Sequence, residues 1–170
     1  MKHAIAALAL AAACSTTPAT AQALNDPVTP AANPEALFTS PDPHLNANKQ
    51  AALHIVRDLL EAGHWEQAPL YLTERYVQHN PMAASGRNGV VHFFVDVLKK
   101  TPAPIPARMK TPVVAVQAEG DYVTVSYVRV VRDPADPTKG YTTTWFDMWR
   151  FVGGKADEHW DPATLPPVAK

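Results

Sequence analysis

The chain has 170 residues, of which 46% are hydrophobic and 18% charged, and this composition is typical of one globular domain rather than of a disordered protein. Its formal net charge is -1, and it has no cluster of Lys and Arg interleaved with aromatic residues. A nucleic-acid-binding protein needs such a basic field, so we expect no nucleic-acid partner.

The first 21 residues have the pattern of a secretory signal peptide. Lys2 forms a short positive region, and the apolar run from Ala4 to Ala13 is too short for a permanent membrane anchor. Ala19-Thr20-Ala21 fits a small-x-small cleavage site, whereas Ala11-Ala12-Ala13-Cys14 is similar to a lipobox. Cleavage after Ala21 fits better, because a lipobox usually has a bulkier residue three positions before its cysteine. We expect an exported, periplasmic protein that contacts a membrane only if Cys14 is lipidated.

Cys14 is the only cysteine of the chain. After cleavage the mature domain therefore has no disulfide, no thiolate metal site and no cysteine nucleophile.

We divide the chain after residue 21 into a Pro-rich extended leader (22–44), a folded domain (45–165) and a C-terminal tail (166–170).

The first half of the domain has a helical pattern. Apolar residues recur at three- and four-residue spacing after Leu45, namely Leu53, Val56 and Leu60, which predicts a helix of about four turns. Asn46 or Asn48 can cap its start, and Gly63 can end it.

Two more helices are expected before the chain changes character. Trp65 to Tyr71 indicates a short second helix, and the segment Tyr76 to Pro81 ends that unit. A loop from Ala83 to Gly89 then precedes a third helix, which Asn88 can cap.

The second half has the pattern of a sheet. Four segments are rich in β-branched and aromatic residues and are separated by turn residues: Val113–Glu119, Tyr122–Arg132, Tyr141–Val152 and Lys155–Trp160. Gly120-Asp121 and Gly153-Gly154 are short enough for tight hairpins, so neighbouring strands should pair antiparallel. The helices must cover one face of this sheet, because neither layer can bury its apolar side alone. The expected fold class is α+β.

The last hairpin carries the densest group of polar and aromatic residues. If Gly153-Gly154 is a two-residue turn, Val152 faces Lys155 and Asp147 lies opposite Trp160. Period-two alternation then divides the strand residues into one face with Trp145, Asp147, Trp149 and Phe151, and another with Phe146, Met148, Arg150 and His159. A bulge would shift this assignment.

Asp147 and His79 are the candidates for chemistry. A carboxylate on an aromatic, half-buried strand is costly to ionise, so Asp147 is either paired with a cation or held where it exchanges protons. In the simpler alternative it only accepts hydrogen bonds or pairs with His79. His79 follows Tyr76 at helical spacing, which would bring its imidazole to the rim of a pocket; alternatively, His79 and Asn80 only cap a turn.

These residues together resemble a known family. The chain is similar to SnoaL-like proteins of the nuclear transport factor 2-like superfamily in the following motifs: Tyr76-Val77-Gln78-His79-Asn80-Pro81, Gly86, Phe93-Phe94, Ala118-Glu119-Gly120-Asp121, Phe146-Asp147-Met148-Trp149-Arg150 and Gly154-Lys155 to Asp161. The resemblance implies a cone-shaped α+β barrel, in which a curved antiparallel sheet wraps around the N-terminal helices and encloses an apolar pocket.

The resemblance also implies a chemistry. In the polyketide cyclases of this family an aspartate takes a proton next to a carbonyl, and the enolate closes a ring by aldol condensation. Asp147 occupies the matching strand. These cyclases also tend to have a histidine on the neighbouring strand, but Val125-Ser126-Tyr127 offers none.

The leading hypothesis is therefore an enzyme of the cyclase or isomerase type, acting without a cofactor on a small hydrophobic or aromatic carbonyl compound. Asp147 would be the general base, and His79 would donate a hydrogen bond to the enolate. The residues expected to contact the ligand are Tyr76, Asn80, Phe94, Trp145, His159 and Trp160.

Three further possibilities remain open at this stage. The pocket can bind a ligand without turning it over, as a non-catalytic module of the periplasm. A metal site can be assembled from His79, Glu158 and His159, although their spacing is not compact. Finally, the alternate sheet face, with Phe146 and Met148, is apolar enough for a homodimer.

Overall fold

The three-dimensional structure is a computed structural model that describes residues 26–166. The predicted signal peptide lies outside the described residues, as does residue 167 onward of the predicted tail. No helix in the described part of the chain has the length and apolar character needed to cross a membrane.

Five strands form one sheet in the order β1-β5-β4-β3-β2. They are β1 (Leu72–Gln78), β2 (Val113–Glu119), β3 (Tyr122–Arg132), β4 (Gly140–Val152) and β5 (Lys155–Trp160). β1 runs parallel to β5, and the other pairs are antiparallel. The four predicted strands are confirmed, whereas β1 was missed. The prediction of a helical spacing between Tyr76 and His79 is wrong, because Tyr76 lies in β1 and His79 directly follows this strand.

One long helix crosses the sheet. It begins as α1 (Pro43–His54) and continues in π-helical turns as η2 (Ile55–Glu61). Its cap is Asp42, whose side chain accepts a hydrogen bond from the Leu45 backbone N–H at 2.9 Å, so neither Asn46 nor Asn48 has the predicted role. Gly63, at a φ of +79°, follows the helix and confirms the predicted stop.

The remaining helices are short. They are η1 (Pro34–Phe38), η3 (Trp65–Gln67), α2 (Ala68–Tyr71), α3 (Arg87–His92) and η4 (Phe93–Val97). The cap of α3 is Gly86 rather than Asn88. η1 belongs to the predicted leader, yet Phe38 is fully buried and the Ala31 N–H donates to the Val113 carbonyl oxygen at 2.8 Å. The second half of the leader therefore packs on the domain.

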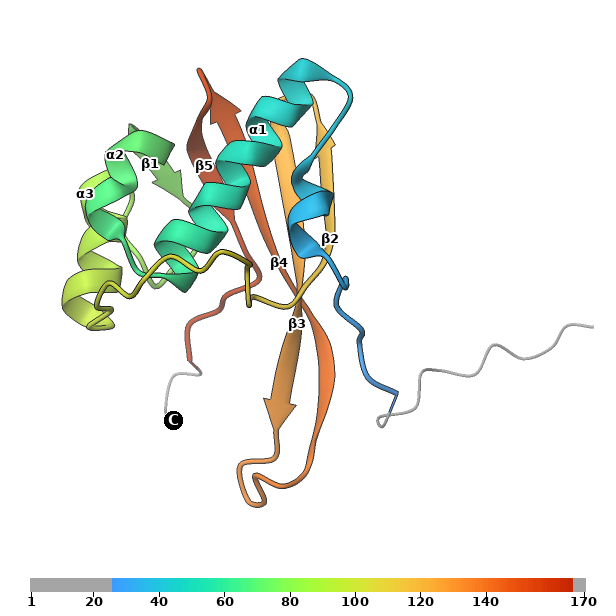
Figure 1. The fold of residues 1–170 in the computed structure, drawn as a ribbon. Coiled ribbons are helices and arrows are strands. Elements are labelled where there is room, and N and C mark those ends of the chain that lie inside the picture. Colours follow the sequence, from blue (N-terminus) through green and yellow to red (C-terminus); the bar gives the residue numbers. More distant parts are fainter. Residues whose placement is uncertain (1–25, 167–170) are drawn as a thin grey trace, which may run out of the picture.

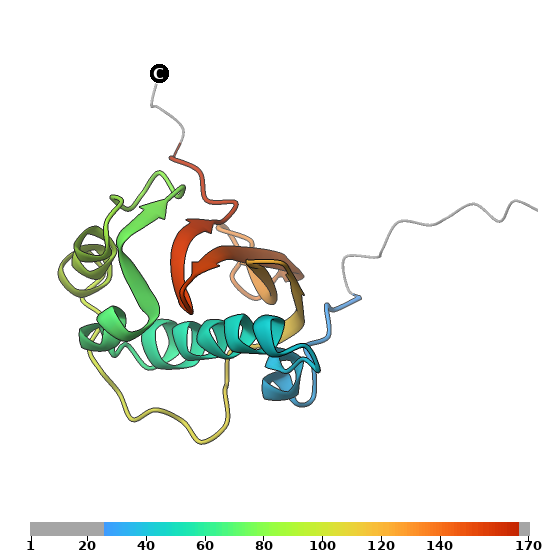
Figure 2. The same cartoon turned by 90° about the horizontal axis from the view of Figure 1, so that it is seen from above.

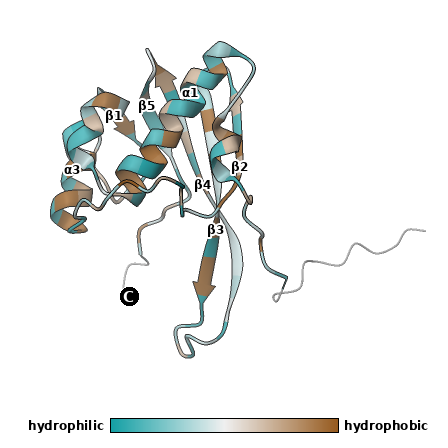
Figure 3. Cartoon of the chain, viewed as in Figure 1, coloured by the Kyte–Doolittle hydropathy of each residue, from teal (hydrophilic) through white to brown (hydrophobic). Residues whose placement is uncertain are grey.

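The sheet curves around the long helix and does not close (Figure 1, Figure 2). The core lies between these layers, with Leu59 from the helix and Val125, Trp149 and Phe151 from the sheet all at most 2% exposed. Apolar residues are concentrated at the η2 end of the helix (Figure 3), which is where the helix faces β1, α3 and β4. The expected fold class, a cone-shaped α+β fold, is confirmed.

A bulge at Asp157 sets the register between β4 and β5. Val152 pairs with Lys155 as predicted, but Phe151 pairs with Ala156 and Arg150 with Glu158, so Asp157 is an extra residue on β5. His159 consequently lies opposite Trp149, and Trp160 lies opposite Met148. The prediction that Asp147 faces Trp160 is wrong, and so is the outward orientation predicted for His159.

Arginines on the outer face of the sheet hold the bulge in place. Arg150 donates to Asp157 at 2.6 Å and to Glu158 at 2.5 Å, and Arg75 on β1 binds the same two carboxylates. These hydrogen bonds lower the pKa of Asp157 below its usual value, with Arg75 as the main cause. The bulge is thus stabilised by arginines from the two neighbouring strands.

Candidate functional site

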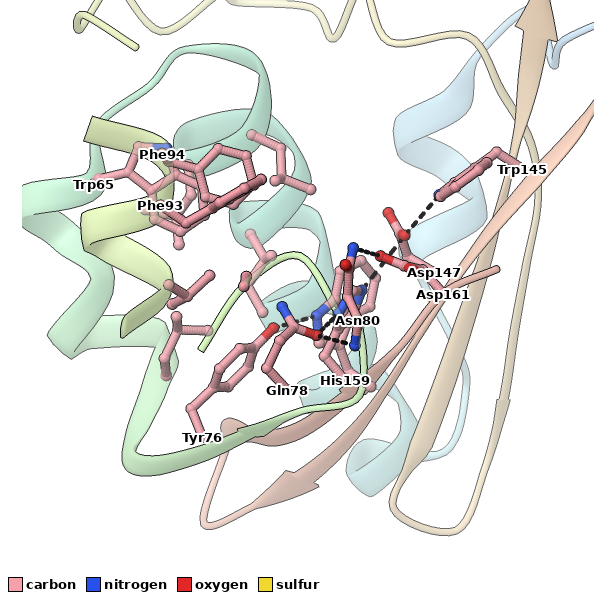
Figure 4. A pocket seen from close by; sticks show the side chains of 17 residues that line it. Trp65, Tyr76, Gln78, Asn80, Phe93, Phe94, Trp145, Asp147, His159 and Asp161 are labelled. Carbon is pink, nitrogen blue, oxygen red and sulfur yellow. Dashed lines mark hydrogen bonds and ion pairs between the residues drawn. The ribbon is translucent and has the colours of Figure 1, made fainter. Parts of the chain in front are cut away.

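A cavity of about 210 Å³ lies between the sheet and the helices η2, α3 and η4. Side chains from β1, β4 and β5 form one side, and those of the helices form the other (Figure 4). The residues that line it are Ile55, Leu59, Leu60, Trp65, Leu72, Tyr76, Gln78, Asn80, Ala83, Val90, Phe93, Phe94, Trp145, Asp147, Trp149, His159 and Asp161.

The helical end of the cavity is aromatic. The rings of Trp65 and Phe94 stack with their centroids 4.0 Å apart, and Phe93 meets Phe94 edge-on at 5.2 Å. The indole N–H of Trp65 is buried and has no hydrogen-bond partner in the described part of the protein. This end offers flat apolar walls to a ring.

The sheet end of the cavity is polar, and Asp147 on β4 is at its centre (Figure 4). Asp147 is 9% exposed, and its Oδ1 accepts a hydrogen bond from the Trp145 indole N–H at 3.1 Å. The same oxygen lies 3.4 Å from Nε2 of His159 on β5. The bulge at Asp157 creates this contact, because it turns His159 toward the inner face.

The protonation of the His159 ring follows from its second neighbour. Nδ1 of His159 lies 2.6 Å from Oε1 of Gln78. This Gln78 atom is the oxygen of the amide, because it also accepts from the Asn80 backbone N–H at 3.2 Å. Nδ1 must therefore carry a hydrogen, and in a neutral ring Nε2 then has only a lone pair.

Nε2 of a neutral His159 would consequently be an acceptor that lies 3.4 Å from the carboxylate oxygen Oδ1 of Asp147. Two acceptors at 3.4 Å repel each other unless a hydrogen lies between them. A single hydrogen on Nε2 or on the carboxyl group would remove this repulsion. A carboxylate and an imidazole in this arrangement are suited to acid–base chemistry inside the cavity.

Asp161 adds a second carboxylate just after β5. Its Oδ2 accepts from the Asn80 side-chain amide at 2.7 Å, and its Oδ1 accepts from the Ala163 N–H at 2.8 Å. One acceptor atom from each of Asp147, His159 and Asp161 lies within 4.8 Å of the others. Among the described residues, these three form the group of metal-ligating types that meet. The predicted set is divided, because His79 contacts Glu158 outside the cavity whereas His159 lines the cavity.

Tyr76 on β1 contributes a hydroxyl group to the cavity. It is 4% exposed, and its oxygen accepts from the Trp149 indole N–H at 3.2 Å. Its own hydrogen meets no acceptor within the region that the structure describes. Burial raises the pKa of Tyr76 well above its usual value of 10, and the charges of Asp147 and Asp161 raise it further, so the phenol stays protonated as a donor.

Six of the eight predicted site residues line the cavity: Asp147, Tyr76, Asn80, Phe94, Trp145 and His159. His79 and Trp160 do not. Tyr76 and Gln78 face inward along β1, so the next residue, His79, points outward. There its ring stacks on Trp160 at 4.7 Å, and its Nε2 lies 3.2 Å from Glu158.

Sequence reasoning missed Gln78 and Asp161. Gln78 is two residues after Tyr76, and that spacing would have placed it on the same face had β1 been recognised. Asp161 comes directly after the last strand, where its orientation depends on Asn80 from a distant part of the chain.

A sequence model described as the SnoaL-like domain matches residues 54–159 of this chain. That segment contains the cavity residues from Ile55 to His159. No curated protein is a significant sequence match.

Several solved structures are similar in shape. An NTF2-like protein of unknown function from Burkholderia pseudomallei has 21% identity and a TM-score of 0.45, and the match covers 69% of this chain and 91% of that one. TerC, crystallised with polyporic acid, has 17% identity and a TM-score of 0.49, with 69% and 92% covered. A candidate SnoaL-like polyketide cyclase from Jannaschia sp. CCS1 has 18% identity and a TM-score of 0.48, with 73% and 91% covered.

Proposed function

The chain belongs to the SnoaL-like domain family, and on this premise we propose that it binds a small carbonyl compound in the cavity and removes a proton from the carbon next to the carbonyl. The observation that carries the proposal is the buried 3.4 Å contact between Asp147 and His159. We propose that these two side chains share one proton. The reaction class is that of an aldol-type cyclase or an isomerase, since both begin with an enolate.

The proton transfer uses the pair as follows. When the shared proton is on Nε2 of His159, Asp147 is a carboxylate and can accept the proton of the substrate C–H bond. The electron pair of that bond then forms the enolate carbon–carbon double bond, and negative charge develops on the carbonyl oxygen. The adjacent imidazolium stabilises this charge and replaces His79 in the role predicted for it.

Tyr76 supplies the donor for the developing oxyanion. No acceptor among residues 26–166 takes its hydroxyl hydrogen, which can therefore bind a ligand. The Trp149 N–H bond to its oxygen polarises it as a donor. Donors fixed before the reaction cost no reorganisation when charge develops, which makes them effective in a buried site. Trp65 and Phe94 provide the walls for the apolar part of the ligand.

Hydrogen–deuterium exchange tests this function directly. Acetophenone is a one-ring ketone with an acidic methyl group, and proton NMR in D2O follows the loss of its methyl signal. We expect the protein to accelerate the loss, and Asp147→Asn to lower the catalysed rate about 10²–10⁴-fold, the usual contribution of a general base. Asp96→Asn removes an exposed carboxylate outside the cavity and should leave the rate unchanged.

The same experiment separates catalysis from binding alone. If acetophenone binds in the cavity but its methyl group exchanges no faster than in buffer, the catalytic proposal fails. The cavity would then belong to a binding module. Exchange that survives in Asp147→Asn would assign the base to another residue.

We also propose that the protein is exported, because Lys2, the apolar run after it and Ala19-Thr20-Ala21 form a signal-peptide pattern. N-terminal sequencing of the protein purified from the periplasm should give Gln22 as the first residue. A mature chain that begins at a lipid-modified Cys14 would support the lipobox instead, and an intact Met1 in the cytoplasm would overturn the proposal.

A further inference from the structure

The charge of the cavity restricts which molecules can enter it. Among the residues described, the titratable side chains that line it are Asp147, His159, Asp161 and the phenol of Tyr76, and none of the lining residues is Lys or Arg. Arg129 stacks on the Trp145 ring at 4.6 Å but is not a lining residue. With one proton on the Asp147–His159 pair, the cavity carries a net charge of -1.

Three acceptor atoms converge at the sheet end of the cavity. Nε2 of His159, an oxygen of Asp147 and an oxygen of Asp161 all lie within 4.8 Å of one another. Their orientations are fixed from behind: Gln78 holds the His159 ring, the Trp145 N–H holds Asp147, and the Asn80 amide holds Asp161. The three groups therefore hold acceptors close together at this end of the cavity.

A primary ammonium group complements this arrangement. It has three N–H donors and one positive charge. Acceptors placed at charge-assisted distances of about 2.7–2.9 Å around one such nitrogen are separated by about 4.4–4.7 Å in tetrahedral geometry. The three ligand atoms lie within 4.8 Å of one another, which is close to this range. An ammonium hydrogen would also satisfy the His159 lone pair in place of the shared proton.

The size and walls of the cavity limit the rest of the ligand. A cavity of 210 Å³ corresponds to the liquid volume of about seven water molecules. This accommodates one ring with a short chain rather than a fused polycycle. The stacked Trp65 and Phe94 rings at the opposite end are suited to an aromatic ring.

We propose that the cavity selects one-ring compounds that carry a primary amine and rejects those that carry a carboxylate. The ammonium group lies among Asp147, His159 and Asp161, and the ring lies against Trp65 and Phe94. This inference rests on the ligand-binding part of the proposed function but not on its chemistry. An amine without a carbonyl occupies the base and therefore competes with ketones.

Three probes of the same shape test the selection: 2-phenylethylamine, 2-phenylethanol and phenylacetate, titrated into the full chain by calorimetry. We expect the amine to bind at least tenfold more tightly than the alcohol, and the alcohol at least tenfold more tightly than the acid. Equal affinities, or a preference for phenylacetate, would overturn the proposal.

Variants locate the selection within the cavity. Asp161→Asn should reduce the preference for the amine over the alcohol to less than threefold, whereas Asp96→Asn on the surface should preserve it. The double variant Asn80→Asp/Asp161→Asn exchanges the partners of the 2.7 Å hydrogen bond, keeps the charge and should retain the preference. If Asp161→Asn unfolds, the double variant is the test of the proposal. Loss of the preference for the amine in a folded double variant would refute the proposal that the negative charge at this place selects amines.

The binding experiments and the exchange assay can fail independently of each other. Amine binding without methyl exchange in acetophenone would support the selection and refute the catalytic proposal. Methyl exchange that 2-phenylethylamine does not inhibit would support catalysis and refute the selection.

Discussion

Replacing Tyr76 by phenylalanine removes one oxygen atom that has two roles in the structure. That oxygen accepts the hydrogen bond of the Trp149 indole N–H, and its hydrogen is directed to no other described acceptor. Trp149 is 1% exposed, so in Tyr76→Phe its N–H stays buried without a partner. An unsatisfied buried donor costs about 1–3 kcal/mol, which for a domain of this size lowers the melting temperature by roughly 4–12 °C.

The effect on catalysis should be larger than the effect on stability. If the Tyr76 hydroxyl stabilises the enolate oxygen, its loss should lower the rate of methyl exchange in acetophenone about 10²–10³-fold, the usual contribution of one oxyanion donor. Proton NMR in D2O measures this rate, and thermal denaturation measures stability. Tyr141→Phe is the matched control, because Tyr141 is 42% exposed and does not line the cavity.

Comparing the two measurements distinguishes a catalytic hydroxyl from a structural one. A folded Tyr76→Phe variant that exchanges acetophenone within threefold of the wild-type rate would refute the role of Tyr76 as the oxyanion donor. A loss of stability of the expected size would then assign the hydroxyl to packing with Trp149 alone.

Three other predictions follow from the structure. Burial alone would raise the pKa of Asp58, but hydrogen bonds from Arg57 and His54 lower it on balance. The stability that the Asp58 charge contributes is therefore present above about pH 4, and it is lost as the pH falls through the lowered pKa of the folded state. Asp58→Asn should therefore lower the free energy of unfolding by about 1.5–3 kcal/mol at pH 7 and by progressively less below pH 4. Urea denaturation measures this loss, and an equal loss at pH 2 would contradict the prediction. His79→Ala should leave the rate of methyl exchange within twofold of the wild-type rate, because the His79 ring stacks on Trp160 outside the cavity. A hundredfold lower rate would instead support His79 as the hydrogen-bond donor to the enolate. Gly63→Ala should lower the melting temperature by several degrees. The φ of Gly63 is +79°, and a Cβ at this position would lie 2.9 Å from the Thr101 carbonyl oxygen. An unchanged melting temperature would contradict this prediction and show that the turn can relax.

The sequence predicts the antiparallel half of the fold well, because its signals are local. Gly120-Asp121 and Gly153-Gly154 separate segments of β-branched and aromatic residues, and the structure has tight turns at both places. β1 has no such signal: Thr73, Glu74 and Arg75 are consecutive polar residues that interrupt any alternation. This strand forms at the edge of the sheet through pairing with β5, about 80 residues later in the chain.

The bulge at Asp157 decided which site residues were predicted correctly. No glycine marks it, and the groups that hold it, Arg75 and Arg150, lie on two other strands. Without knowledge of this tertiary contact, uninterrupted alternation turns His159 outward and Trp160 inward. Asp147 was unaffected because it lies on β4, whose pairing with β3 is regular from Trp145 to Arg150.

The central claim is that Asp147 and His159 hold one proton between them because Gln78 keeps the hydrogen on Nδ1. Long-range proton–nitrogen NMR spectra of the His159 ring test this claim directly, with the resonances assigned by comparison with His159→Gln. We expect Nδ1 to be protonated in the wild type, and the neutral ring of Asp147→Asn to keep the Nδ1–H tautomer. A neutral ring with hydrogen on Nε2 and a bare Nδ1 would contradict the account, because His159 would then donate directly to Asp147 and no additional proton would be needed.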